Sequence, residues 1–273
     1  MPNLTVLMAP SDQKQPGGNP FAPDMFDYRT SGTFNYFDAL NPERRALIDT
    51  LHNVLDTHDT DELSALFGLE GPALDEALRV NNEIYDAPLM SALDRYSPGI
   101  MYAAMDFANL PTGAQRRLLE NGIIISGLFG LLRPDDLIPN YQLKITNEIP
   151  DIGLLTDYWR DTISPVLNDY LEGRFVWDLL PDAHRGAWND SHDYEARVVV
   201  HFEENTGSGY EPVPPEELDI QRGQFVNYVV RETAEEIEDL EEWEDHPDGF
   251  SLAKRSTKHD EATRTWHVYM RRS

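Results

Sequence analysis

The chain has 273 residues, of which 49 are acidic and 22 basic, and its formal charge at pH 7 is −27. Because this charge repels phosphate backbones, the composition excludes a protein that coats nucleic acid through its net charge, but not one with a local basic cleft. Cysteine is absent, which excludes disulfides, thiolate nucleophiles, cysteine–zinc sites and iron–sulfur clusters.

The N-terminal part of the chain predicts one buried strand followed by helices. Leu4–Met8 reads LTVLM and is expected to be the strand, and the glycine- and proline-rich stretch after Pro10 is expected to be loop. Residues 42–57 have apolar residues at helical spacing, with Pro42 at the first helical position. Residues 61–80 predict a helix, a break and a second helix.

The break at residues 66–78 holds Gly68 and Gly71 between two amphipathic helices, which resembles a helix–hairpin–helix. In that motif, backbone amides and a helix N-terminus hold a phosphate. A glycine followed by a proline is also the ordinary sequence of a tight turn. The residues alone favour the turn, because acidic residues stand beside it.

The middle of the chain predicts helices ending near residue 109 and at 115–121, and then a buried strand at 123–126. A glycine turn, Arg133 and two aspartates follow this strand. That order is typical of a ligand-facing edge of an α/β sheet. The plainer interpretation, which the chemistry favours, is a turn in which Arg133 pairs with Asp135 or Asp136.

The C-terminal half predicts a helix at 154–170, strands at 175–180, 196–202 and 265–270, and a long helix at 222–243. The valines and Ile237 of the long helix are expected to be buried and its carboxylates exposed. Glu235, Glu238 and His246 could be drawn as an iron-binding site. A solvated acidic face without metal is the favoured interpretation.

Strands and helices alternate along the whole chain. We expect a single compact mixed α/β domain, 1–273, with helices packed around a central sheet and a flexible insertion at 205–217. The longest apolar run, residues 122–132, is shorter than the roughly 20 residues of a membrane span. The first ten residues lack the basic region of a signal peptide. The expected location is therefore cytoplasmic, without a membrane segment.

Ordered segments spread over nearly the whole chain carry a resemblance to a known family. The most specific is ISGLFGLLRPDDLIPNYQL at 125–143, and weaker ones are the strand and loop at 7–18, the tract at 87–106, Tyr-Trp at 158–159, and FVWDLLP at 175–181. Together they resemble the YaaA family of peroxide stress proteins.

This resemblance implies a single-domain α/β fold and a cytosolic role in resisting hydrogen peroxide by limiting damage from unincorporated iron. It also implies DNA binding through a helix–hairpin–helix and a basic cleft. Two basic positions of the family pattern differ here, because Gln142 replaces an arginine and only Arg222 is charged within residues 220–224. Each lost cation weakens phosphate contact, so any DNA binding is expected to be weak and nonspecific.

The leading hypothesis is a stress protein of this family that binds nucleic acid through a local cleft. Lys14, Arg95, Arg133 and Arg222 would hold phosphates, with Arg133 facing the same cleft as Lys14 and Arg95. Tyrosines would stack on bases. The candidate DNA- or ligand-binding residues are Ser11, Lys14, Gly68, Gly71, Asp94, Arg95, Tyr96, Tyr102, Ser126, Arg133, Tyr141 and Arg222.

The alternative hypothesis is a binding protein or enzyme for a nucleotide or phosphorylated metabolite, using the same residues. Asp94 or Asp178 would act as a base or metal ligand, and Ser11 or Ser126 would donate hydrogen bonds. An enclosed pocket would favour this hypothesis, and an open groove would favour nucleic acid. The sequence holds no P-loop, dinucleotide-binding glycine motif, HExxH or nucleophile–base pair, so we assign no catalytic residue, cofactor or metal.

Overall fold

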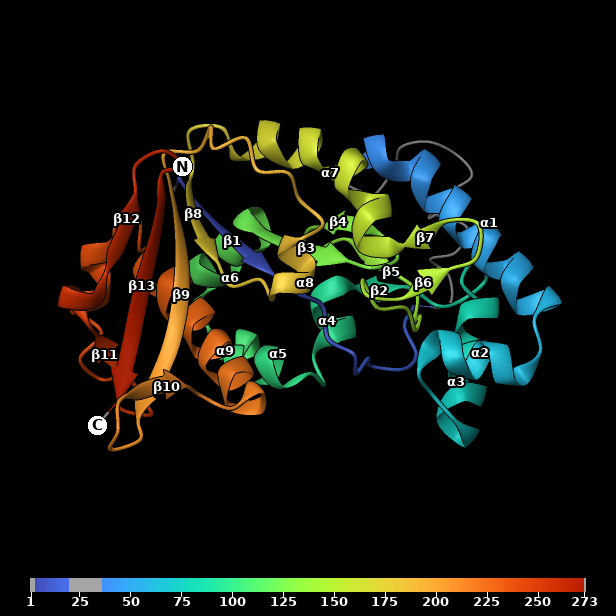
Figure 1. Cartoon of the computed structure of the whole chain (residues 1–273), viewed down its shortest axis with the longest axis horizontal. Coiled ribbons are helices and arrows are strands. Elements are labelled where there is room, and N and C mark those ends of the chain that lie inside the picture. The colour runs from blue at the N-terminus through green and yellow to red at the C-terminus, as the bar shows by residue number, and fades with distance from the viewer. Residues whose placement is uncertain (1–2, 20–35, 273) are drawn as a thin grey trace.

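The structure, a computed structural model, describes residues 3–19 and 36–272, and a mostly parallel sheet runs through it (Figure 1). The strand order is β11-β13-β9-β8-β1-β3-β4, with β10 on β9 and β12 on β13. Strands β1, β3, β8, β9 and β13 form the parallel part. The bounds are β1 Leu4–Met8, β3 Gly122–Ser126, β4 Gly130–Leu132, β8 Phe175–Asp178, β9 Ala196–Asn205, β10 Tyr210–Pro212, β11 Ser251–Leu252, β12 Lys258–Asp260 and β13 Thr265–Arg272.

The apolar strands form the middle of this sheet. Every residue of β1 and of β3 is buried, which is typical of parallel strands covered on both faces. The strands expected at 4–8, 123–126, 175–180, 196–202 and 265–270 are all present. The predicted mixed α/β fold with a central sheet is therefore confirmed.

Helices cover the sheet and extend it at one end. In Figure 1, α7 lies at the upper edge and α5 and α9 at the lower edge, and α1, α2 and α3 form the end farthest from β13. The helices are α1 Asn41–Thr57, α2 Thr60–Phe67, α3 Gly71–Asn82, α4 Ala92–Tyr96, α5 Ile100–Met105, α6 Thr112–Asn121, α7 Leu155–Leu171, α8 Asp182–Arg185 and α9 Pro215–Glu232. Short 3-10 helices are η2 Asp38–Leu40, η3 Phe107–Asn109, η4 Ile237–Glu241 and η5 Lys254–Ser256.

Two short ribbons lie outside the main sheet. β2, Met90–Ser91, pairs with β5, Leu137–Ile138, and β6, Glu148–Ile149, pairs with β7, Gly153–Leu154. Both pairs are antiparallel.

The sequence predicted a long helix at 222–243, and both of these bounds are wrong. Helix α9 begins at Pro215, because a proline at the first helical position loses no hydrogen bond there. It ends at Glu232, because Thr233 adopts a left-handed conformation with φ 63° and the chain then turns into η4. The valines Val226, Val229 and Val230 are buried as expected.

Two further segments differ from the sequence-based expectation. Residues 205–212 form a hairpin in which β10 pairs antiparallel with β9, and α9 follows at once, so the sequence did not predict a strand and a helix start that lie within 205–217. The helix expected to run to residue 109 is divided into α4, α5 and η3, because Pro98 and Gly99 follow α4 and because Asp106, with φ 50°, ends α5. Glycines and prolines at the hairpin turn and after α4 set the local backbone conformation.

The largest fully buried side chains join the helices to the sheet. Trp177 of β8 packs edge to face on Phe225 of α9, with 5.1 Å between the ring centroids, and its ring centroid lies 5.0 Å from that of Phe175. The Trp177 indole donates a hydrogen bond to the Ala234 carbonyl. Trp159 of α7 donates to the Gly127 carbonyl at 2.8 Å. Among the residues that the structure describes, no helix has both the length and the apolar character to cross a membrane.

Candidate functional site

A pocket opens where strands β1 and β8 end. These parallel neighbours direct their carboxyl ends to the same edge of the sheet, and residues after both strands line the pocket together with residues of α5, α8 and α9. Its volume is about 300 Å³. Open α/β sheets bind ligands in crevices of this kind. We call it the Ser11 pocket, and its polar lining residues are Ser11, Asp12, Gln13, Tyr102, His184, Asp219 and Arg222.

The wall of the Ser11 pocket after β1 is fixed by local hydrogen bonds. The Ser11 hydroxyl accepts a bond from the Gln13 amide at 3.0 Å, and the Tyr102 hydroxyl donates to the Ala9 carbonyl at 2.8 Å. Gly99 lies directly against Ser11, and a Cβ at this position would overlap the Ser11 side chain. The glycine is therefore required for the serine to sit where it does.

The opposite wall carries a cation and an imidazole. Arg222 of α9 pairs with Asp219 one helical turn earlier, at 3.1 Å, and the arginine side chain is only 16% exposed. His184 of α8 has a buried Nδ1 atom without a hydrogen-bond partner among the described residues. Desolvation by burial lowers the pKa of His184 to about 4, with Asp12 opposing and Arg222 assisting. The imidazole is therefore neutral at neutral pH.

The burial of His184 can be tested through the pH dependence of the free energy of unfolding. Because its pKa is about 4 when folded and near 6.5 when unfolded, the unfolded state binds the proton first as the pH falls below 6.5. Between pH 7 and pH 4.5, the free energy of unfolding of His184→Gln should therefore fall by about 2 kcal/mol less than that of the wild type. Urea unfolding of both proteins at both pH values measures this, and identical losses would contradict the burial of His184.

Lys14 lies beside a group of hydroxyls behind the loop that follows β1. The Tyr141 hydroxyl lies 2.7 Å from that of Tyr96 and 2.8 Å from the Ser126 hydroxyl. The Lys14 ammonium lies over the Tyr141 ring, 4.4 Å from its centroid, and 5.9 Å from the centroid of Tyr96. We call Lys14, Tyr96, Ser126 and Tyr141 the Lys14 cluster. It adjoins the Ser11 pocket, since the rings of Tyr96 and Tyr102 are 5.5 Å apart.

The expectation that the tyrosines stack on bases is wrong for this structure. Tyr96 and Tyr141 are completely buried and Tyr102 is 5% exposed, so no ring face is open to a base. The Ser126 hydroxyl is also used internally, since it accepts from the Phe129 amide at 3.2 Å and so fixes the turn after β3. These side chains support the pocket from behind.

Arg95 does not face the pocket, although its neighbour Tyr96 belongs to the Lys14 cluster. It is completely buried, and its guanidinium donates to the carbonyls of Gln15, Pro88 at 3.0 Å and Ile138 at 3.3 Å. It therefore connects three separate segments of the chain and cannot hold a phosphate in this conformation. Its charge still acts on Lys14 at short range.

The expectation that Arg133 faces the same cleft as Lys14 and Arg95 is wrong. β4 runs antiparallel to β3 and carries the chain back from the edge where the Ser11 pocket lies. The Arg133 guanidinium donates to the Leu119 carbonyl at 2.6 and 3.0 Å and lies 3.5 Å from the ring centroid of Tyr36. It also pairs with Asp135 at 3.4 Å, as the plainer interpretation of the sequence proposed.

Arg133→Ala is expected to lower the free energy of unfolding by about 2 kcal/mol, because it removes charge-assisted bonds to a helix carbonyl from a part-buried side chain. It should leave DNA affinity at low salt unchanged. Arg116→Ala is the matched control, since Arg116 is 76% exposed and, among the described residues, pairs with Glu120 of its own helix. A selective loss of DNA binding in Arg133→Ala would restore the original expectation.

The other candidate residues lie apart from the pocket. Gly68 ends α2 with φ 62° and Gly71 begins α3 with φ 54°, so both serve the left-handed positions of a tight turn. This turn lies at the end of the molecule farthest from β13 (Figure 1). Asp94 is exposed and accepts a bond from the Ser91 hydroxyl at 2.7 Å at the start of α4.

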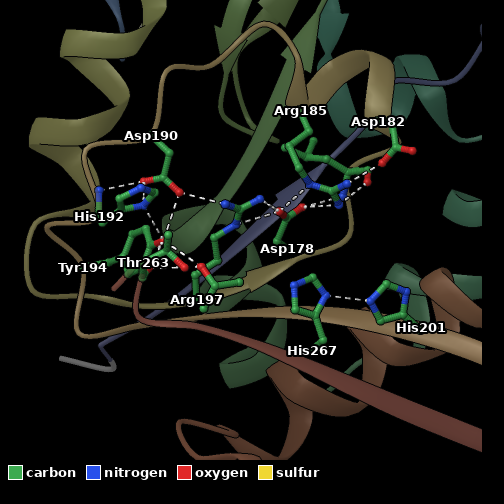
Figure 2. Close-up of polar contacts among 12 residues, drawn as sticks. Asp178, Asp182, Arg185, Asp190, His192, Tyr194, Arg197, His201, Thr263 and His267 are labelled. Carbon is green, nitrogen blue, oxygen red and sulfur yellow. Dashed lines mark hydrogen bonds and ion pairs between the residues drawn. The ribbon is translucent and has the colours of Figure 1, made fainter. Parts of the chain in front are cut away.

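A buried ion-pair network lies beside the pocket, centred on Asp178 at the end of β8 (Figure 2). Asp178 accepts from Arg185 at 2.9 Å and from Arg197 at 2.6 Å, and Arg197 also pairs with Asp190 at 2.7 Å. Burial raises the pKa of Asp178, but the two arginines outweigh it and the pKa is lowered. With both oxygens occupied, Asp178 holds α8 in place and is not free to act as a base.

The acidic segment near the C-terminus shows no converging ligands. The part of the chain that the structure describes contains no group of three or more histidine, aspartate or glutamate side chains that could hold a metal ion. Glu238 is exposed, whereas Glu235 is part-buried and accepts a bond from the Asn3 amide.

His184 and Asp219 line the Ser11 pocket but were not predicted from the sequence. A signal for His184 was present, because it follows the carboxyl end of a predicted strand, where open α/β sheets place ligand contacts. Asp219 carried no such signal, since it preceded the predicted start of its helix.

The fold and the pocket define an α/β protein with a polar crevice at the carboxyl edge of its sheet. The family model described as "Peroxide stress protein YaaA" matches residues 4–256, and the chain belongs to this family. A UPF0246 protein of Streptomyces coelicolor is 28% identical over 197 residues, 72% of each chain. A UPF0246 protein of Corynebacterium efficiens is 28% identical over 206 residues, 76% of each chain. An uncharacterised protein of Campylobacter jejuni is 26% identical over 178 residues, 64% of this chain and 67% of the relative.

Proposed function

We propose that this protein acts in the peroxide stress response and that it does so by binding a small anionic ligand in the Ser11 pocket. The description of its family supports the first part. The second part rests on one observation, a cavity of about 300 Å³ whose wall carries a guanidinium, a neutral imidazole and hydroxyls. This size suits a small molecule and not a duplex.

The two walls of the pocket suit different parts of such a ligand. Only one nitrogen of the Arg222 guanidinium is bonded within the described structure, to Asp219, so the remaining donors are available to a phosphate or carboxylate. The Nδ1 atom of His184 is buried without a hydrogen-bond partner among the described residues, and a hydroxyl of the bound ligand would supply one. A nucleotide or phosphorylated metabolite carries both kinds of group.

The family resemblance also suggests DNA binding and protection from unincorporated iron. Of the four cations expected to hold DNA, Arg95 and Arg133 are engaged with backbone carbonyls, which leaves Lys14 and Arg222. With about two phosphate contacts, the slope of log affinity against log salt would be near −2. DNA binding through these groups would therefore be weak, nonspecific and confined to low salt, and the proposal assigns no iron site to this chain.

Calorimetric titrations with AMP and with ribose 5-phosphate test the ligand part of the proposal. Arg222→Gln should weaken binding at least about tenfold, because one charge-assisted contact is worth about 1.5–3 kcal/mol. Arg231→Gln is the matched control on the same helix, since the surface residue Arg231 pairs with its neighbour Glu232 in the part of the chain that the structure describes. Equal loss in both variants, or no binding in the wild type, would contradict the proposed ligand class.

The stress part is tested separately in cells that lack their own family member. The wild-type chain and Arg231→Gln should restore survival in hydrogen peroxide, and Arg222→Gln should not. Restoration by Arg222→Gln would mean that the pocket is not how the protein acts. Failure of the wild type to restore survival would contradict the stress role itself.

A further inference from the structure

We propose that a groove at the edge of the sheet opposite to the Ser11 pocket docks a basic, partly apolar segment of a partner protein. Its volume is about 540 Å³, and its lining includes Phe175 and Ala196, the first residues of β8 and β9, and Trp266 near the start of β13. These strands run parallel, so the groove lies at their amino ends, whereas the Ser11 pocket lies where β1 and β8 end. We call it the Trp266 groove.

The floor of the Trp266 groove is apolar. Its larger side chains are Phe175, which is buried, and Ile237, Leu252 and Trp266, which are part-buried. Such surface gains free energy when the side chains of a partner cover it. Cavities of about 300–1,000 Å³ take molecules of drug size, so this groove has room for a short peptide segment.

The rim of the Trp266 groove is strongly acidic. Five glutamates and one lysine, Lys254, belong to the lining. Lys254 pairs with Glu241, and among the described residues the other four glutamates have no ion pair. These four are Glu195, Glu235, Glu236 and Glu238. The groove therefore keeps a net negative charge, which is complementary to a cationic partner.

Hydrogen bonds hold several of these carboxylates in place. Asn3 donates its backbone amide to Glu235 and its side-chain amide to Glu195, the latter at 2.9 Å. The Glu236 side chain accepts from the backbone amide of Asp239 and so caps η4. A carboxylate that accepts one bond keeps further lone pairs for a guanidinium. Because the rim is ordered before a partner arrives, docking loses less conformational entropy.

An extended segment in which arginine alternates with apolar residues suits both parts of the groove. The guanidinium groups would donate to the rim, and the arginine stems and the apolar side chains would cover the floor. A metal ion would gain nothing from the apolar floor. Nucleic acid would be repelled by the glutamates. A segment of a basic protein is therefore the occupant to which the charge and the floor together point.

Fluorescence anisotropy with a short, capped and labelled peptide of alternating arginine and leucine tests the proposal on the full chain. The whole protein has a formal charge of −27, so a peptide of alternating arginine and serine is needed to measure attraction that does not use the floor. At about 0.15 M salt, where distant charges are screened, the leucine peptide should bind at least about tenfold more tightly than the serine peptide.

Two double variants with the same change in net charge locate the binding. Glu238→Gln with Glu241→Gln should weaken binding of the leucine peptide at least about tenfold, because two rim contacts are lost and Lys254 loses its partner. Glu242→Gln with Glu244→Gln is the matched control, since these glutamates are exposed in the same segment but lie outside the lining, and it should weaken binding less than about twofold.

Equal binding of the two peptides, or equal losses in the two double variants, would overturn the proposal. A wild-type dimer that only the Glu238 and Glu241 double variant dissociates would also overturn it, because a second copy of the chain would then occupy the groove. Arg222→Gln should leave peptide binding unchanged, since Arg222 lines the Ser11 pocket and not the Trp266 groove. Failure of the ligand proposal would therefore be seen independently.

Discussion

Asp178→Asn is expected to lower the free energy of unfolding by about 3 kcal/mol or more, the usual cost of removing one partner from a buried ion pair. Asp178 is completely buried, and the side chain of Arg197 is only 10% exposed. The asparagine would leave two guanidinium groups with a neutral partner inside the protein. The remaining pair between Arg197 and Asp190 offsets only part of this loss.

Asp178→Asn should also weaken ligand binding in the Ser11 pocket. Arg185 joins α8 to Asp178, and His184 directly precedes Arg185 in that helix. Urea unfolding measures the stability, and titration with AMP measures the pocket. Asp182→Asn is the control, since Asp182 pairs with the same arginine but is fully exposed, and its loss should cost less than about 0.5 kcal/mol. Equal stability of the two variants would show that the network contributes nothing.

The parallel strands and the longer helices could be predicted because their apolar residues form short runs or recur at helical spacing. β1 and β3 are short uninterrupted apolar runs, and α1 and α7 have one apolar face each. The end of α9 could not be read in the same way. Apolar residues continue at helical spacing beyond Glu232, and a threonine in a left-handed conformation gives no signal in the sequence.

The prediction that four cations share one cleft was wrong for a different reason. Sequence order shows which cations follow strands, but not whether their donors are already used. Arg95 and Arg133 are both held by backbone carbonyls, whereas Lys14 and Arg222 keep donors available. Carbonyls left unpaired by loops and helix ends attract arginine forks, and these partners are distant in sequence. Only the folded chain reveals which arginines they engage.

The two ends of the sheet also explain why Ser11 and His184 line one pocket while Arg133 lies apart from it. β1 and β8 run parallel and end together, so residues that follow them share one edge. β4 reverses direction, and Arg133 after it lies toward the opposite edge. The sequence predicted β1, β3 and β8, but it predicted neither β4 nor its antiparallel pairing with β3, and that pairing decides the position of Arg133.

Gly223→Ala is expected to lower the free energy of unfolding by about 3 kcal/mol, because it places a methyl group where helices α5 and α9 touch. A Cβ at Gly223 would overlap the carbonyl oxygen of Met101 and come within 2.8 Å of the Ala104 methyl and 2.9 Å of the Met105 nitrogen. Two of these atoms belong to the backbone of α5, so the helices must separate to accept it. Alanine's higher helix propensity, worth about 1 kcal/mol, offsets only part of this cost.

Separation of α5 and α9 should also weaken the pocket, since Tyr102 stands on one helix and Arg222 on the other. Gly113→Ala is the matched control, because Gly113 is also helical but a Cβ there meets nothing within 4 Å, and it should leave stability unchanged or raise it slightly. Thermal unfolding and AMP titration of both variants measure the two effects. A Gly223→Ala protein as stable as Gly113→Ala, with unchanged AMP affinity, would show that the close approach of α5 and α9 does not hold Tyr102 and Arg222 in position.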